Sequence, residues 1–209
     1  GSLDKLGLKL VADDIFTPPL ADASPLVQKL RSTRPDFMLL LPTATSDYKL
    51  ILDKINEFGL GKGKLPLVSN GAPLGTPEIL KLLGKDLLEG LIFSIANWPV
   101  KGQDKLVDTF KKETGEPWMT QDSICTYGDM WIFKEALEAA GKADRKAVAE
   151  TIRKMETKGG SGQYFPGGGG VMKFDDKGRR VGAEIVFVQW QGGEPITVFP
   201  EAAAMKAPI

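Results

Sequence analysis

Small polar residues follow three apolar runs of this chain, and their hydroxyl and amide groups could hydrogen-bond a small molecule. The runs are residues 37–41, 65–68 and 90–95. Ligands of parallel sheets bind outside the carboxyl ends of the strands, where such residues would lie. The residues that we expect to contact a ligand there are Thr43, Ala44, Thr45, Ser46, Asn70, Gly71 and Trp98.

Two of these segments also have a purely structural interpretation. Thr45 or Ser46 could be the N-cap of the following helix, and a neighbouring residue could still face a ligand. Asn70 and Gly71 could form a turn, because the Asn-Gly pair favours positive φ angles. Both alternatives stay open at the level of the sequence.

The residue types argue against catalysis. The chain has no histidine, which removes the commonest general base and most zinc sites. Its single cysteine, Cys125, is expected to be a small buried hydrophobe. Ser46 and Lys49 have the spacing of serine β-lactamases, but no Lys-Thr-Gly motif accompanies them. The glycine- and lysine-rich segment 59–64 precedes a strand, so it is not a phosphate-binding loop. We expect no enzyme activity, cofactor or metal.

Composition narrows the class of protein further. The 209 residues can form one large or two small domains, and 42% of them are hydrophobic. The 27 basic residues balance the 27 acidic ones, and no basic stripe suggests nucleic-acid binding. The apolar runs are too short to span a bilayer, and no stretch of this chain has the organisation of a signal peptide.

The first half of the chain alternates predicted strands and helices. This order predicts right-handed crossovers and a parallel α/β sheet with both faces covered. The strands are expected at 8–12, 36–41, 65–69 and 90–95. The helices are expected from the N-cap Ser24, at 46–58 and at 77–83.

The pattern changes after Trp98. Three helices are expected without strands between them, within residues 104–155. A flexible glycine-rich loop should follow at 158–170. Next comes an antiparallel pair of strands at 171–174 and 183–190, then a strand at 196–199. The tail, 201–209, is expected to be mobile.

Several short motifs occur in an order that is specific as a set. They are Leu6–Val11, Leu26–Leu30 with Arg34-Pro35-Asp36, Glu89-Gly90, Tyr127–Met130 and Phe174–Gly178. In this order and spacing the chain resembles the type I periplasmic binding proteins. It is most similar to the branched-chain amino acid/amide receptors of ABC importers.

The resemblance implies that this chain is the C-terminal part of a protein with two α/β lobes. The fold class is then α/β, with a doubly wound parallel sheet, helices of another lobe and a C-terminal antiparallel pair. The implied division is 1–97 in the second lobe, 98–157 as helices of the first lobe, 158–170 as the loop, 171–200 as strands returning to the second lobe, and 201–209 as the tail.

The resemblance also implies a function. It is that of a periplasmic or extracytoplasmic solute-binding protein, which delivers an amino acid, amide or aromatic acid to the membrane subunits of an ABC importer. Alternatives are a ligand-sensing domain of a receptor or regulator, and an α/β hydrolase that uses Ser46. The helices would pack on the missing first lobe or associate with a second copy through apolar residues. These are Leu106, Phe110, Tyr127, Met130, Trp131, Phe133, Val148 and Ile152.

Four positions of the implied site differ in how they could contact a ligand. The family places a ligand-contacting loop at 43–46, but its aromatic residue is absent here. It places a glutamate near Asn70, which carries no charge. Trp98 lies at the implied crossover, where it either stacks on a ligand or plugs the hinge. Asp122 begins a helix that the family turns toward the cleft, so it is either a ligand contact or a helix cap.

Overall fold

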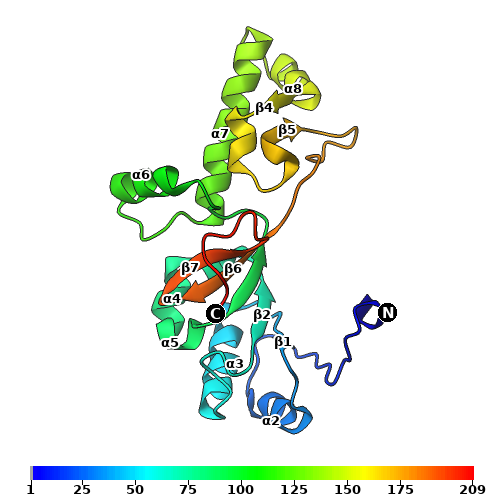
Figure 1. The fold of residues 1–209 in the computed structure, drawn as a ribbon, viewed down its shortest axis with the longest axis vertical. Helices are drawn as coiled ribbons and strands as arrows, with labels where there is room; N and C mark the ends of the chain where they lie inside the picture. Colours follow the sequence, from blue (N-terminus) through cyan, green and yellow to red (C-terminus); the bar gives the residue numbers. More distant parts are fainter. Residues whose placement is uncertain (1) are drawn as a thin grey trace. The chain divides into compact units, whose positions relative to one another are not determined.

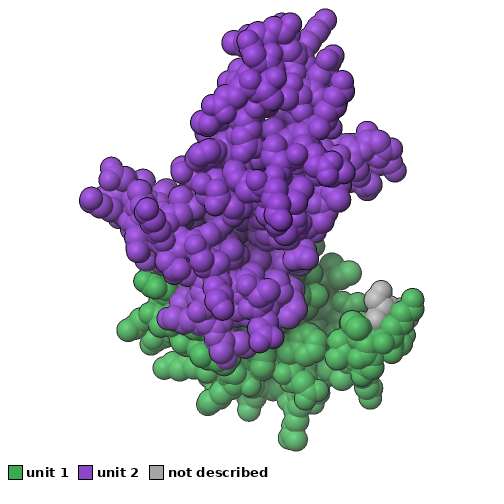
Figure 2. Space-filling model, turned by 45° about the horizontal axis from the view of Figure 1, so that its top comes forward, with its two compact units in different colours: residues 1–93, 189–194, 209 green, residues 94–188, 195–208 purple. Residues whose placement is uncertain are grey.

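A computed structural model describes residues 2–209 of the chain (Figure 1). These residues form two compact units (Figure 2). Unit 1 comprises residues 1–93, 189–194 and 209, and unit 2 comprises residues 94–188 and 195–208. The assignment of chain segments to two lobes, as the resemblance implies it, stays a prediction.

Unit 1 alternates helices and strands, as its sequence predicts (Figure 1). Its helices are α1 (Ser2–Lys5), α2 (Ser24–Thr33), α3 (Thr45–Glu57), η1 (Ala72–Gly75), α4 (Pro77–Leu83) and α5 (Lys85–Leu88). The strands of this region are β1 (Met38–Leu39), β2 (Leu67–Asn70) and β3 (Ile92–Ile95).

The main sheet confirms the α/β class. Its strand order is β1-β2-β3-β6-β7, where β6 is Val186–Gln191 and β7 is Glu194–Phe199. β1 and β2 are parallel, with Met38 opposite Leu67. Between β6 and β7 lie Gly192 and Gly193, with φ angles of 64° and 91°. This is the backbone of a tight hairpin, so β6 and β7 form a C-terminal antiparallel pair.

Apolar residues at helical spacing hold unit 1 together. Ile51 and Ile55 on α3 are 0% and 1% exposed, as the predicted i, i+4 pattern requires. Trp190 on β6 is fully buried, and its indole Nε1 donates to the carbonyl oxygen of Leu74 at 2.9 Å. This bond satisfies the one polar group of a side chain that is otherwise surrounded by the core.

Unit 2 is mainly helical. Its elements are α6 (Asp104–Thr114), α7 (Gln121–Ala140), α8 (Arg145–Lys154), β4 (Glu156–Lys158), η2 (Gly160–Tyr164), η3 (Gly168–Gly170) and β5 (Val171–Lys173). One core cluster of unit 2 consists of Ala136, Val148, Met155 and Met172, against which Ile152 packs. Val148 and Ile152 therefore belong to this cluster and not to the open apolar surface that the sequence suggested.

The strand predicted at 8–12 is wrong. Residues 8–18 have no regular structure, and Leu8, Leu10 and Val11 are 37%, 61% and 41% exposed. Their apolar alternation is weak, and an extended segment needs neighbouring strands to become stable. Ser24 is also not an N-cap: α2 begins at this residue, whose hydroxyl donates to Asp22 Oδ1 at 2.7 Å.

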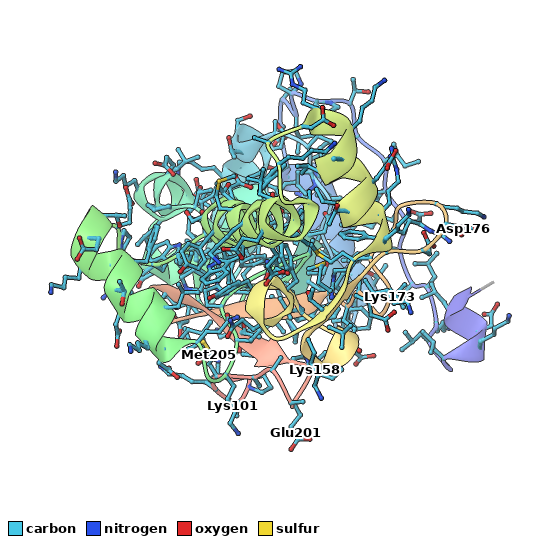
Figure 3. All side chains as sticks on the ribbon, turned by 90° about the horizontal axis from the view of Figure 1, so that it is seen from above. Lys101, Lys158, Lys173, Asp176, Glu201 and Met205 are labelled. Atoms are coloured by element: carbon cyan, nitrogen blue, oxygen red, sulfur yellow. The ribbon has the colours of Figure 1, made fainter. Side chains whose placement is uncertain are left out.

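The predicted pairing of 171–174 with 183–190 is wrong as well. β5 instead pairs with β4 in a separate two-stranded sheet, in which Val171 lies opposite Lys158. The turn itself is present, since Gly178 N donates to Asp175 O at 3.0 Å. Asp176 lies at its exposed end (Figure 3). A turn fixes only a local reversal, and the choice of strand partner depends on residues far away in sequence.

The glycine-rich segment 158–170 is not the predicted flexible loop. It contains two short 3-10 helices, and Ser161 is fully buried. Glu135 on α7 accepts hydrogen bonds from Ser161 N at 2.9 Å and from Ser161 Oγ at 2.6 Å. Glycine is needed here for close approach, because a Cβ on Gly160 would lie 1.8 Å from Glu135 Oε1.

We expect Gly160→Ala to lower the free energy of unfolding by about 1–3 kcal/mol, because φ is +51° and the new methyl displaces Glu135. Gly169→Ala is the matched control, since Gly169 has φ +60° but no atom near its Cβ position. Urea unfolding of both variants measures the difference. Equal losses would show that backbone strain alone matters and that Glu135 does not hold this segment.

The tail, predicted to be mobile, is hydrogen bonded. Within unit 2, Met205 N donates to Thr197 O at 2.9 Å, and Lys101 N donates to Ala203 O at 3.0 Å. Glu201 and Met205 are labelled on this segment in Figure 3. Within unit 1, Ile209 N donates to Gln189 Oε1 at 2.9 Å. These bonds depend on contacts with distant residues, which the composition of the tail does not reveal.

Candidate functional site

The carboxyl ends of β1 and β2 lie side by side in unit 1. The two strands are parallel, and Leu40 N donates to Val68 O at 2.8 Å just beyond the last paired residues. The chain then continues into residues 43–46 after β1 and into Gly71 after β2. Both predicted ligand segments therefore follow the same edge of the sheet. Their contact with a ligand stays a prediction.

The side chains of these segments are mostly accessible. Thr43, Thr45, Ser46 and Asn70 are exposed, and Ala44 and Gly71 are half-buried. α3 begins at Thr45, and its N-cap is Ala44, which makes no side-chain capping bond. The N-cap alternative for Thr45 or Ser46 is therefore wrong, and their hydroxyls are not used in that role.

Gly71 supports the turn alternative. Its φ angle is 103°, which only glycine adopts easily, and it precedes η1. Leu74 N donates to Gly71 O at 3.3 Å, as expected for a tight turn. Asn70, the last residue of β2, precedes this turn and has an exposed side chain. Turn formation and ligand contact are thus compatible at this position.

A buried carboxylate, which the sequence analysis did not identify, directly follows the segment 43–46. Asp47, in the first turn of α3, is 1% exposed. Its Oδ1 accepts a hydrogen bond from Leu20 N at 3.0 Å. Its Oδ2 is buried without a hydrogen-bond partner among the described residues. Asp47 ties the chain before α2 to the start of α3. The sequence offered no signal for this role, because an acidic residue in a first helical turn is ordinary.

A buried pair of hydroxyls was also missed. Tyr48 and Ser69 are 4% and 1% exposed, and their oxygens lie 2.7 Å apart. Ser69 Oγ also donates to Leu40 O at 2.5 Å. Burial raises the pKa of Tyr48. The register of β1 and β2 and the placement of α3 bring these residues together, and the sequence gives neither.

The other two predicted site residues belong to unit 2. Trp98 is 2% exposed, and its Nε1 donates to Pro195 O at 3.1 Å. This burial leaves little ring surface for a ligand. Asp122 is exposed and is not a cap, since Thr120 is the N-cap of α7 and accepts from Ser123 N at 3.4 Å. Ligand contact by these residues stays a prediction.

Unit 2 also contains an apolar hollow of about 620 Å³. Its apolar lining includes Ile132, Phe133, Ile152, Phe165, Met172 and Phe174. Cys125 lines it too, and burial raises the pKa of this thiol. Asn97 Nδ2 lies 3.5 Å from its sulfur. Asn97, Asp129, Arg180 and Glu184 also line the hollow, so a few polar and charged groups interrupt its apolar wall, as is common in small-molecule sites. The predicted ligand segments 43–46 and 70–71 are not part of this lining.

Lys49, one of the two residues with the spacing of a serine β-lactamase, is engaged in an ion pair. Lys49 Nζ forms an ion pair with Asp53 Oδ2 at 2.8 Å, one helical turn further along α3. Within residues 2–209, no group of three or more His, Cys, Asp or Glu side chains is arranged to hold a metal ion. In the same range, no helix combines the length and apolar character needed to cross a membrane.

Comparison with known proteins gives a consistent group of relatives. The sequence profile of a family described as periplasmic binding protein matches residues 1–194. A Leu/Ile/Val-binding protein homolog 7 from Brucella melitensis is 26% identical over 210 residues, which cover 98% of this chain and 51% of that protein. The chain thus spans about half the length of the curated relatives it matches.

Solved structures show the same fold. A putative branched-chain amino acid ABC transporter protein from Silicibacter pomeroyi superposes with a TM-score of 0.73 at 15% identity, over 98% of this chain and 54% of its own. An ABC transporter substrate-binding protein from Desulfitobacterium hafniense, in complex with Leu, gives 0.65 at 20% identity, over 93% and 53%. At such identities the likeness concerns the fold alone.

Proposed function

The chain belongs to the periplasmic binding protein family, and we propose that it is the C-terminal part of an extracytoplasmic receptor that delivers a small solute to an ABC importer. The observation that carries the proposal is the shared carboxyl edge of β1 and β2. Two segments of small polar residues, 43–46 and 70–71, follow that edge with mostly accessible side chains. This is the position at which parallel α/β sheets bind ligands.

The proposed ligand is an amino acid, an amide or an aromatic acid. The names of the relatives point to branched-chain amino acids. Asn70 offers an uncharged amide at a position where the resemblance implies a carboxylate for the ligand's ammonium. An amide can both donate and accept hydrogen bonds, so it suits a neutral polar group of the ligand. Asn70 therefore favours an uncharged hydrogen-bonding group of the ligand over an ammonium group.

The proposed mechanism is closure of two lobes around the solute, which is released unchanged to the membrane subunits of the importer. Residues 1–97 and 171–200 would build the second lobe, and helices 98–157 would belong to the first. The exposed apolar side chains of α7 would then be covered by the remainder of the first lobe or by a second copy. These side chains are Tyr127, Met130, Phe133 and Leu137.

We expect the 209-residue chain to bind L-leucine, acetamide or benzoate only weakly, with a Kd on the order of 1 mM or above, because one lobe supplies half of the contacts. Amide chemical-shift changes on titration are expected at 43–47 and 70–71. Asn70→Ala should abolish them. Asn56→Ala, an exposed asparagine near the other end of α3, should leave them unchanged.

Shifts that avoid these two segments would contradict the proposed site. Saturable binding at micromolar Kd would show that the other lobe contributes little, and the division of the chain into lobes would then be wrong. Turnover of a probe that Ser46→Ala abolishes would favour the hydrolase alternative instead.

A further inference from the structure

Three elements of unit 1 meet at one buried hydroxyl. Ser69 on β2 donates its only hydroxyl proton to Leu40 O, which can only accept. The hydroxyl of Tyr48 on α3, 2.7 Å away, must therefore donate to Ser69 Oγ. The result is a directed chain of hydrogen bonds from α3 through β2 to the end of β1, in which both side chains are buried.

The three residues lie next to both proposed ligand segments. Leu40 precedes Thr43 by three positions, and Tyr48 follows Ser46 by two. Ser69 immediately precedes Asn70. The hydrogen bonds thus close the loop after β1 at both of its ends, and they tie that loop to the strand that carries Asn70.

We propose that Ser69 and Tyr48 are positioning residues that fix the loop 43–46 relative to Asn70 and so set the spacing of the ligand contacts. This inference rests on the proposed function. Neither side chain touches a ligand, because both are buried; they act through the backbone of their neighbours. The hydrogen bond from Leu20 N to Asp47 Oδ1 holds the same turn of α3 from the other side.

The alternative is that Ser69 and Tyr48 only stabilise unit 1 as a whole. Amide hydrogen exchange distinguishes this general stabilisation from local positioning of the loop. If the hydroxyls position the segments, Ser69→Ala should speed amide exchange at 43–48 and 70–72 by about tenfold, with other slowly exchanging amides of unit 1 within about twofold. Tyr48→Phe should give the same local pattern. It removes one hydroxyl and leaves the ring in place, so it serves if Ser69→Ala does not fold.

Two further variants control the experiment. Ser161→Ala removes another buried hydroxyl, which donates to Glu135 Oε2 at 2.6 Å in unit 2, and should leave exchange at 43–48 unchanged. Ser69→Thr keeps a hydroxyl and should restore slow exchange. A uniform acceleration throughout unit 1, or no change at 43–48 and 70–72, would overturn the positioning role.

Leucine titration of the same variants adds a readout that stability does not move. At a temperature where each variant is fully folded, Ser69→Ala and Tyr48→Phe should raise the Kd for leucine several-fold, and Ser161→Ala should not. If the wild-type chain bound none of the probes, the proposed function would fail, whereas unchanged local exchange would overturn the positioning role even in a chain that binds.

Discussion

Replacing Trp98 with alanine is expected to lower the free energy of unfolding by about 3–5 kcal/mol, the usual cost of truncating a large buried aromatic side chain. The indole is 2% exposed and donates through Nε1 to Pro195 O at 3.1 Å. The variant therefore loses apolar burial and a buried hydrogen bond together. Urea unfolding, followed by circular dichroism, measures the loss.

Two other variants make the Trp98 result specific. Trp98→Phe keeps most of the apolar volume and loses the hydrogen bond, so about 1–3 kcal/mol is expected. Trp131→Ala removes a half-buried indole and should cost clearly less than Trp98→Ala. If Trp98 instead stacks on a ligand, Trp98→Phe would change ligand affinity, and Trp98→Ala would leave stability nearly intact. That pair of results would contradict the hinge plug.

Local patterns predicted most of unit 1 from the sequence. The spacing of Ile51 and Ile55 marks α3, and the apolar run before Asn70 marks β2. The first signal arises because one face of a helix is buried, and the second because a whole strand is buried. Each pattern is complete within a few consecutive residues. The segment 8–12 shows the limit of such signals: it has apolar alternation but no paired neighbour among the described residues, and it forms no strand.

The candidate site could be predicted only in outline. Small polar residues after a strand are visible in the sequence, so the sequence predicts ligand contacts at 43–46 and Asn70, and this stays a prediction. Ser69 and Tyr48 were not predicted, because their contact depends on the register of two strands and on the tilt of a helix. The same reason explains the incorrect partner for β5, whose pairing with β4 joins residues about fifteen positions apart.

Because α7 has an exposed apolar face, we expect the 209-residue chain alone to self-associate at micromolar concentration. Met130 and Phe133 are 56% and 48% exposed, and Tyr127 and Leu137 are 39% and 41% exposed. Fully burying an exposed side chain of this kind contributes about 1.5–3 kcal/mol, and these four are already about half buried, so covering them is worth on the order of 3–6 kcal/mol. That is a sizeable fraction of the stability of a whole domain, about 5–15 kcal/mol.

Sedimentation velocity with a charged variant tests this face directly. Met130→Lys combined with Phe133→Lys should shift the chain toward the monomer and reduce binding of a hydrophobic dye, because a buried lysine opposes association. Met205→Lys, at a methionine 36% exposed on the tail, is the matched control and should leave association unchanged. A wild-type chain that sediments as one monomeric species, melts cooperatively and binds no dye would show that this face needs no cover. The proposed packing of α7 against the first lobe or a second copy would then lose its physical basis.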